Sequence, residues 1–210
     1  TMLTHQFFTA NTPAQGFWAE HVFKDVYSLT QLENSLEKLA FPKNKNDLNG
    51  HDPFGAVLGD GFEAFGEIIF QKLGMHPDLS VDKLVVCPPG QIGYDFTFTH
   101  TKNQLPGTIQ SKYMGKAKAW ESELREGEKM KLERFQNASY NVARVPIDVT
   151  ENLIVFTNAT GIDYFTADTL LYGKVRCIGR KHINFLTKEN PAFWDTAREM
   201  IMQANPYIKF

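Results

Sequence analysis

The chain has 210 residues, of which 42% are hydrophobic and 22% charged, and its formal net charge at pH 7 is −2. This length and composition are typical of an ordinary globular protein and exclude a disordered or low-complexity chain. The small negative charge excludes a protein that coats nucleic acid through a broad excess of Lys and Arg, but it allows a local basic groove. Cys87 and Cys177 are too few for a disulfide framework or a cysteine-rich zinc site, so buried thiols are expected.

The sequence predicts no membrane-spanning segment. Its longest apolar runs, such as 68–70 and 153–156, are far shorter than the roughly 20 residues that cross a bilayer. The N-terminus has neither the basic region nor the apolar run of a secretory signal. We therefore expect a cytoplasmic protein. The chain begins Thr1-Met2 and ends at Phe210, which raises the alternative that it is a part of a longer protein.

The N-terminal part is expected to be helical, because Pro13 suits a helix start and apolar residues recur at helical spacing from Phe17 to Leu32. The stretch 42–59 is dense in Lys, Asn, Asp, Gly and Pro, which indicates a connector. Residues 1–58 are therefore expected to form an N-terminal helical extension and linker. Residues 59–210 are expected to form the core domain with a C-terminal helix.

The core domain is expected to begin with a helix over residues 60–73. Asp60 is expected to cap its start and Gly74 to end it. Its apolar stripe, at steps of three and four, is made of Phe62, Phe65, Ile69 and Leu73. Strands are predicted over 83–87 and over 91–99, where aromatic and polar residues alternate. A turn over 101–107 then leads into a third strand over 108–113.

The second half of the chain continues the alternation of helices and strands. Residues 116–137 are charged and periodic, which predicts a solvent-facing helix or helix pair broken near Gly127. The apolar stretch 153–157 predicts a short buried strand. Further elements are expected as a helix over 160–171, a strand over 175–178, and closing helices over 182–186 and 191–203. Strands in the middle, with helices before, between and after them, predict an α/β fold with a mixed sheet.

Three side chains of the predicted hairpin carry chemistry. Asp95 on one strand and Gln110 and Lys112 on the next can face the same side, because residues two apart share a face. Together they present a carboxylate, an amide oxygen and an ammonium group. Cleavage of a phosphodiester with the help of Mg²⁺ requires such oxygen ligands and a nearby cation. Glu63 on the preceding helix adds a second carboxylate, and Glu67 lies one turn further along the same face.

These residues occur within an ordered series of short motifs. A run from Phe62-Glu63 to Leu73-Gly74 is followed by Gly93-Tyr94-Asp95 and then by Gln110-Ser111-Lys112. The order resembles that of the Mrr-type restriction endonuclease group within the PD-(D/E)xK nuclease superfamily. In that group a Phe-Glu pair opens a helix that ends in Leu-Gly, a Gly-x-Asp follows on one strand, and a Gln-x-Lys on the next.

The later part of the chain extends the resemblance. The stretch 153–158, with Ala167 in the helix after it, is similar to the group's strand-then-helix segment. The stretch 177–179, leading into Ile183 and Leu186, resembles its closing strand and helix. Two features depart from the group: Tyr94 stands where a small residue is usual, and the insertion over 116–149 is long.

The resemblance implies a restriction-endonuclease-like fold, with a mixed central sheet flanked by helices. It implies a metal-dependent endodeoxyribonuclease that uses Mg²⁺ or Mn²⁺. Asp95 would be a metal ligand, and Gln110 would fill the second acidic position of the superfamily motif. Lys112 would be the catalytic cation, and Glu63 the helix-borne acid that helps to hold the metal and its water.

DNA is therefore the expected substrate and partner. Arg180 and Lys181 are candidate phosphate contacts, as are Lys116 and Lys118, although a solvated helix is the alternative for the latter pair. A homodimer is expected, because cutting both strands needs two sites. One alternative is a DNA-binding or assembly module that keeps the nuclease fold without cutting. Another is the nuclease part of a larger restriction or helicase protein.

Overall fold

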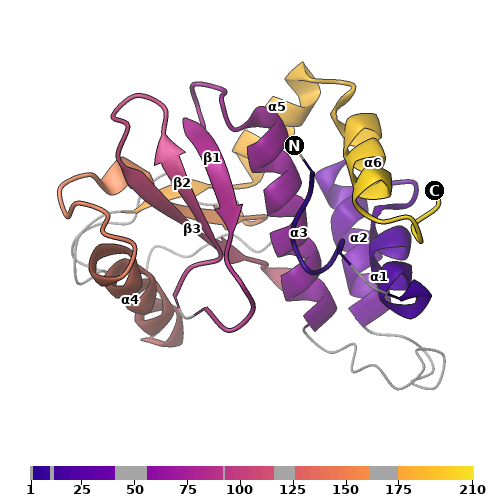
Figure 1. Ribbon diagram of the computed structural model, residues 1–210, viewed down its shortest axis with the longest axis horizontal. Coiled ribbons are helices and arrows are strands. Elements are labelled where there is room, and N and C mark those ends of the chain that lie inside the picture. Colours follow the sequence, from indigo (N-terminus) through magenta and orange to yellow (C-terminus); the bar gives the residue numbers. More distant parts are fainter. Residues whose placement is uncertain (1, 10–11, 41–55, 92, 116–125, 161–174) are drawn as a thin grey trace. The chain divides into compact units, whose positions relative to one another are not determined.

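The computed structural model describes residues 2–9, 12–40, 56–91, 93–115, 126–160 and 175–210 (Figure 1). The chain divides into two compact units, Thr1–Ile68 with Asn184–Phe210, and Ile69–Ile183. We call them unit 1 and unit 2. None of the described helices is both long enough and apolar enough to span a membrane.

Unit 1 is helical. It contains α1 (Pro13–Phe23), α2 (Leu29–Ala40), most of α3 (Ala56–Leu73), the end of α5 (Arg180–Glu189) and α6 (Phe193–Ala204). Its core is aromatic: Phe65 is fully buried, and its ring stacks on that of Trp194 with 5.5 Å between centroids. The boundaries of the two units thus fall inside α3 and α5, whereas the sequence suggested a single division after residue 58.

The N-terminal segment over residues 2–9 is an integral part of unit 1. Leu3 and Phe8 are buried. The side chain of Asn205, which follows α6, donates a hydrogen bond of 2.7 Å to the backbone oxygen of Phe8. The segment therefore packs with the helices of unit 1 instead of extending from them.

Unit 2 is built around a mixed sheet. The described residues form five strands, namely β1 (Val81–Val86), β2 (Phe96–His100), β3 (Pro106–Lys112), β4 (Leu153–Thr157) and β5 (Arg176–Ile178). The strands lie in the order β1-β2-β3-β4-β5. β2 pairs antiparallel with both β1 and β3, whereas β3, β4 and β5 run parallel to one another. The expectation of an α/β fold with a mixed sheet is confirmed.

Helical residues cover both faces of this sheet. On one face, α4 (Glu126–Asn141) contributes Leu132 and Phe135 to a buried cluster with Leu153 and Val155 of β4 (Figure 1). On the other face, the ring of Phe70, in the last turn of α3, lies 5.2 Å from that of Phe156. Because both faces are covered, every residue of β4 is buried.

The predicted start of the core domain's first helix was wrong. α3 begins at Ala56, so Asp60 lies inside the helix and does not cap its start. The additional turn is stabilised by burial of Val57, which is 5% exposed. α4 runs from Glu126 to Asn141, so the part of the predicted helix or helix pair that precedes residue 126 lies outside the described residues.

β2 is also shorter than expected, because the chain bends before it. Gly90 and Gly93 have φ angles of 88° and 108°, which only glycine adopts without strain. A Cβ at position 93 would also lie 2.5 Å from the Cβ of Ala138. The predicted helix over 160–171 falls almost wholly outside the described residues, as does most of the predicted connector.

Candidate active site

Asp95 and Gln110 lie side by side where β2 begins. The backbone nitrogen of Asp95 donates to the oxygen of Ile109 at 2.8 Å, which extends the β2–β3 pairing by one residue. Asp95 Oδ2 accepts hydrogen bonds from Gln110 Nε2 at 2.9 Å and from the backbone nitrogen of Ser111 at 2.7 Å. The hairpin therefore brings Asp95 and Gln110 into contact, as expected from their positions on neighbouring strands.

The hydrogen bonds of Gln110 fix the orientation of its amide. Nε2 donates both to Asp95 and, at 3.2 Å, to the backbone oxygen of Ser111. Both partners are acceptors, so the nitrogen of the amide faces them and Oε1 faces elsewhere. The half-buried pair thus offers a carboxylate and an amide oxygen, which are the kinds of ligand that Mg²⁺ prefers.

Lys112 follows two residues later on β3. In the parallel pairing of β3 and β4, Gln110 lies opposite Val155 and Lys112 opposite Thr157, so the two side chains share a face of the sheet. Lys112 Nζ is buried. A buried ammonium is stable only where negative charge or hydrogen-bond acceptors stabilise it.

Glu63 has a partner that the sequence did not indicate. It lies on the unit 1 part of α3, and its Oε1 is 3.0 Å from Nε2 of the buried His5. His5 Nδ1 accepts a hydrogen bond from the backbone nitrogen of Phe7 at 3.0 Å. Neutral His5 therefore carries its proton on Nε2 and donates it to Glu63. The Glu63 side chain keeps 22% of its surface exposed.

Glu67 is a structural carboxylate. It is fully buried and accepts hydrogen bonds from the backbone nitrogens of Thr4, at 2.7 Å, and His5, at 3.1 Å. It also accepts one from the hydroxyl of Thr4 at 3.0 Å. These bonds attach the N-terminal segment to α3, and they involve both oxygens of the Glu67 carboxylate.

Asp60 belongs to the same helix face. Burial raises the pKa of its carboxyl group, and the nearby charge of Glu63 raises it further, while His5 acts in the opposite direction. The environment of Asp60 therefore favours its neutral form more than water does.

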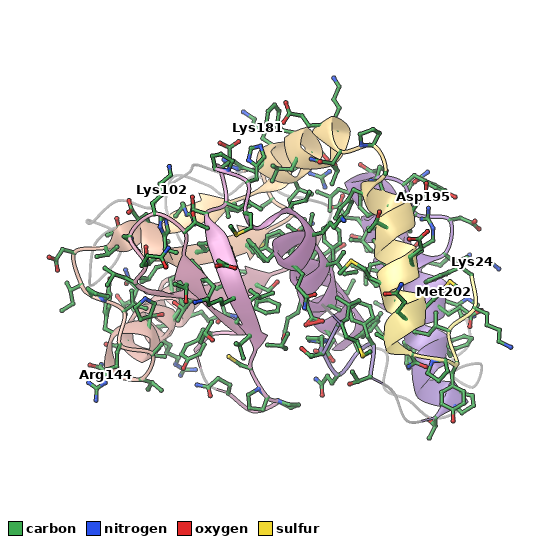
Figure 2. The ribbon with its side chains drawn as sticks, turned by 45° about the horizontal axis from the view of Figure 1, so that its top comes forward. Lys24, Lys102, Arg144, Lys181, Asp195 and Met202 are labelled. Atoms are coloured by element: carbon green, nitrogen blue, oxygen red, sulfur yellow. The ribbon has the colours of Figure 1, made fainter. Side chains whose placement is uncertain are left out.

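The expected DNA contacts are placed in part. Arg180 begins α5, and its Nε donates to the backbone oxygen of Asn158 at 3.1 Å. Lys181 is exposed on α5 (Figure 2). Lys116 and Lys118 lie outside the described residues. Arg176, on β5, has a structural contact: its guanidinium donates a hydrogen bond of 2.7 Å to the backbone oxygen of Leu79.

Sequence reasoning assigned no role to Asn158, which directly follows β4. It is fully buried, and its side chain forms hydrogen bonds with the backbone of Met114, two residues beyond Lys112. The available signal was an amide residue at the end of an otherwise apolar strand, because a buried amide must find hydrogen-bond partners.

The donor set suits Mg²⁺ or Mn²⁺ better than a metal held wholly by protein. Among the described residues, no group of three His, Cys, Asp or Glu side chains is arranged to hold a metal ion. Asp95 and Gln110 supply one carboxylate and one neutral oxygen. Mg²⁺ commonly binds through one or two carboxylates and completes its shell with water and substrate phosphates. The residues present therefore fit such an ion.

Comparisons of the chain with family models, with curated proteins and with solved structures give no match.

Proposed function

We propose that the chain is a metal-dependent endodeoxyribonuclease, which hydrolyses phosphodiester bonds of DNA with Mg²⁺ or Mn²⁺. The observation that carries the proposal is the hydrogen bond between the side chains of Asp95 and Gln110. Lys112, whose ammonium is buried, lies two residues after Gln110 on the same strand. An acid, an amide oxygen and a cation on one hairpin are the groups that this reaction needs.

The order of the elements supports the proposal. α3 carries Glu63, Asp95 immediately precedes β2, and β3 carries Gln110 and Lys112. A buried strand, β4, comes next along the described chain, and β5 leads directly into α5. This is the order of motifs in the nuclease group that the sequence resembles.

Asp95 and Gln110 would hold the ion through their side-chain oxygens. The backbone nitrogen of Ser111 orients the Asp95 carboxylate by donating to Oδ2. A bound Mg²⁺ or Mn²⁺ would polarise the phosphate and lower the pKa of a water molecule.

Lys112 would stabilise the negative charge that grows on the phosphate oxygens during attack, or the attacking hydroxide itself. Such fixed charges are effective because they need no reorganisation when the reaction occurs. The burial of Nζ strengthens this effect, since the interaction of two charges is larger where water is excluded.

Glu63 is the second carboxylate of the proposal. Its Oε1 binds His5, and Glu63 would be the helix-borne acid that helps to hold the metal and its water. Arg180 and Lys181 would contact the sugar-phosphate backbone of the DNA, which positions the duplex without reading its sequence.

The test is nicking of supercoiled and of single-stranded circular DNA with Mg²⁺ or Mn²⁺. Asp95→Ala and Lys112→Ala should each lower the rate by about 100-fold or more, because each removes charge stabilisation of the transition state. Two exposed residues of unit 2 provide matched controls, and Asp148→Ala and Lys102→Ala should cleave like the unchanged protein.

Equal cleavage by all five proteins would refute the proposal. Salt-sensitive DNA binding without metal-dependent nicking by any of them would instead support the alternative of a binding module that keeps the nuclease fold.

A further inference from the structure

Two buried asparagines flank β4. Asn152 immediately precedes the strand and Asn158 immediately follows it, and neither exposes any of its surface. A buried side-chain amide is stable only when its donors and acceptor are bonded. Both asparagines satisfy this requirement by bonding to the backbone next to β3, each at a different end of that strand.

Asn158 bonds both backbone groups of one residue. Its Oδ1 accepts from the nitrogen of Met114 at 2.7 Å, and its Nδ2 donates to the oxygen of Met114 at 2.8 Å. The β3–β4 pairing ends at Lys112 opposite Thr157. The side-chain amide of Asn158 thus binds the chain that leaves β3 to the end of β4, just beyond the last backbone pair of the two strands.

Asn158 also connects to the start of α5. Its backbone oxygen accepts the hydrogen bond from Arg180 Nε, and the oxygen of the next residue, Ala159, accepts one from the backbone nitrogen of Arg180 at 3.0 Å. Gly179 allows this close approach, because a Cβ there would lie 2.8 Å from the oxygen of Ala159. One residue thus bonds both the exit of β3 and the side chain of Arg180.

We propose that Asn158 is a positioning residue, which sets Lys112 for the reaction, while its backbone oxygen binds the side chain of Arg180. The inference rests on the proposed function. Four rotatable bonds separate the Lys112 ammonium from its Cα, so its position depends on a fixed backbone at the end of β3. Loss of the Met114 contacts frees that backbone, and a shift of about 1 Å at a catalytic group costs about 100-fold in rate.

Asn152 provides a matched control on the same two strands. Its Nδ2 donates to the oxygens of Leu105 at 3.2 Å and Pro106 at 2.8 Å, where β3 begins. It also exchanges hydrogen bonds with the side chain of Asn103. Asn152 is therefore as buried and as well bonded as Asn158. It binds the backbone where β3 begins, however, whereas Lys112 is the last residue of β3.

The experiment compares Asn158→Ala with Asn152→Ala at a temperature where both are fully folded by circular dichroism. The first readout is the rate at which an amine-acylating reagent modifies Lys112, measured by mass spectrometry, which requires no nuclease activity. We expect Asn158→Ala to raise this rate about tenfold through local opening, and Asn152→Ala to leave it unchanged.

The second readout is DNA nicking. Asn158→Ala should lower kcat by about 10- to 100-fold with little change in KM, whereas Asn152→Ala should retain the kcat of the unchanged protein. If Asn158→Ala does not fold, Asn158→Asp replaces it, because Asp keeps the acceptor for the Met114 nitrogen and loses only the donor.

The outcomes separate the two proposals. If the unchanged protein does not nick DNA, the proposed function fails, and the acylation contrast still decides the role of Asn158. If the two alanine variants match in Lys112 acylation, Asn158 does not position Lys112, and the inference is overturned. It is equally overturned if they match in kcat while Lys112→Ala abolishes nicking.

Discussion

Asp95 and Gln110 are 15 positions apart in the chain, yet their side chains are joined by a hydrogen bond of 2.9 Å. A carboxylate at position 110 would instead place two negative charges in contact, and one of them would be held neutral or displaced. The amide therefore makes the hairpin stable without a cation. With an amide at position 110, Asp95 is the residue of this hairpin whose negative charge can attract a cation.

Gln110→Glu tests this relationship. Without metal, the variant should lose about 1–2 kcal/mol of stability, because a hydrogen bond is replaced by repulsion between carboxylates. Mg²⁺ should raise its melting temperature by more than it raises that of the unchanged protein, since the second carboxylate strengthens binding to the folded state. Differential scanning calorimetry with and without Mg²⁺ measures both effects. Identical responses to Mg²⁺ would count against a metal site at Asp95 and Gln110.

Lys181→Ala tests the DNA contact at α5. Each phosphate contact that is lost should reduce the slope of log affinity against log salt by about one. We expect that change for Lys181→Ala, measured by fluorescence anisotropy with a labelled duplex over a range of NaCl concentrations. Lys102, which is also exposed but lies in the β2–β3 turn, serves as the control (Figure 2). Equal slopes for both variants would remove Lys181 from the interface.

Glu67→Gln should destabilise unit 1. Both oxygens of the buried carboxylate accept hydrogen bonds, from the backbone nitrogens of Thr4 and His5 and from the Thr4 hydroxyl, and an amide cannot accept all of them. The expected loss is about 2–3 kcal/mol, measured by urea unfolding. Glu63→Gln is the comparison on the same helix: its bond to His5 survives through the amide oxygen, so the loss should be about 1 kcal/mol or less. A milder effect at Glu67 than at Glu63 would contradict the structural role of Glu67.

His100 should make the stability of the protein depend on pH. Burial lowers the pKa of its imidazole below 6.5, and the positive charge of Arg176 lowers it further, partly offset by Glu151. Nδ1 accepts hydrogen bonds from the backbone nitrogens of Lys102 and Asn103, which only the neutral ring can do. The unfolded chain therefore binds this proton more readily than the folded one.

It follows that the contribution of His100 is fully present above about pH 6.5 and is lost as the pH falls toward its lowered pKa. His100→Asn keeps an acceptor for the turn but does not titrate. The free energy of unfolding, measured by urea titration between pH 5 and pH 7, should fall less on acidification in the variant than in the unchanged protein. Parallel curves would show that His100 titrates alike in the folded and the unfolded chain.

The parts of the fold that could be predicted were those with strong local patterns. β4 is a run of four apolar residues followed by Thr157, and its bounds were predicted correctly. The alternation around Phe96 and Phe98 identified β2, and the positions of Asp95 and Gln110 in the hairpin followed from strand geometry. In each case the residues that decide the structure are close together in the sequence.

The other features depend on contacts between distant residues. The start of α3 was misplaced because the stretch up to Gly59 indicates a loop. In the structure the helix already includes these residues, and a Cβ at position 61 would overlap the buried Leu36 side chain of α2. A glycine there permits close packing of helices. The partner of Glu63 is His5, 58 positions away, and no local pattern announces such a pair.

The order of the strands has a consequence for how unit 2 folds. Each strand of the sheet pairs with the strand that precedes it in the chain, and β1, β2 and β3 are joined by short connections. This meander has low contact order and can form early, because little loop-closure entropy opposes it. The parallel strands β4 and β5 need longer crossovers and should dock later, so we infer that the hairpin carrying Asp95 and Gln110 belongs to the folding nucleus.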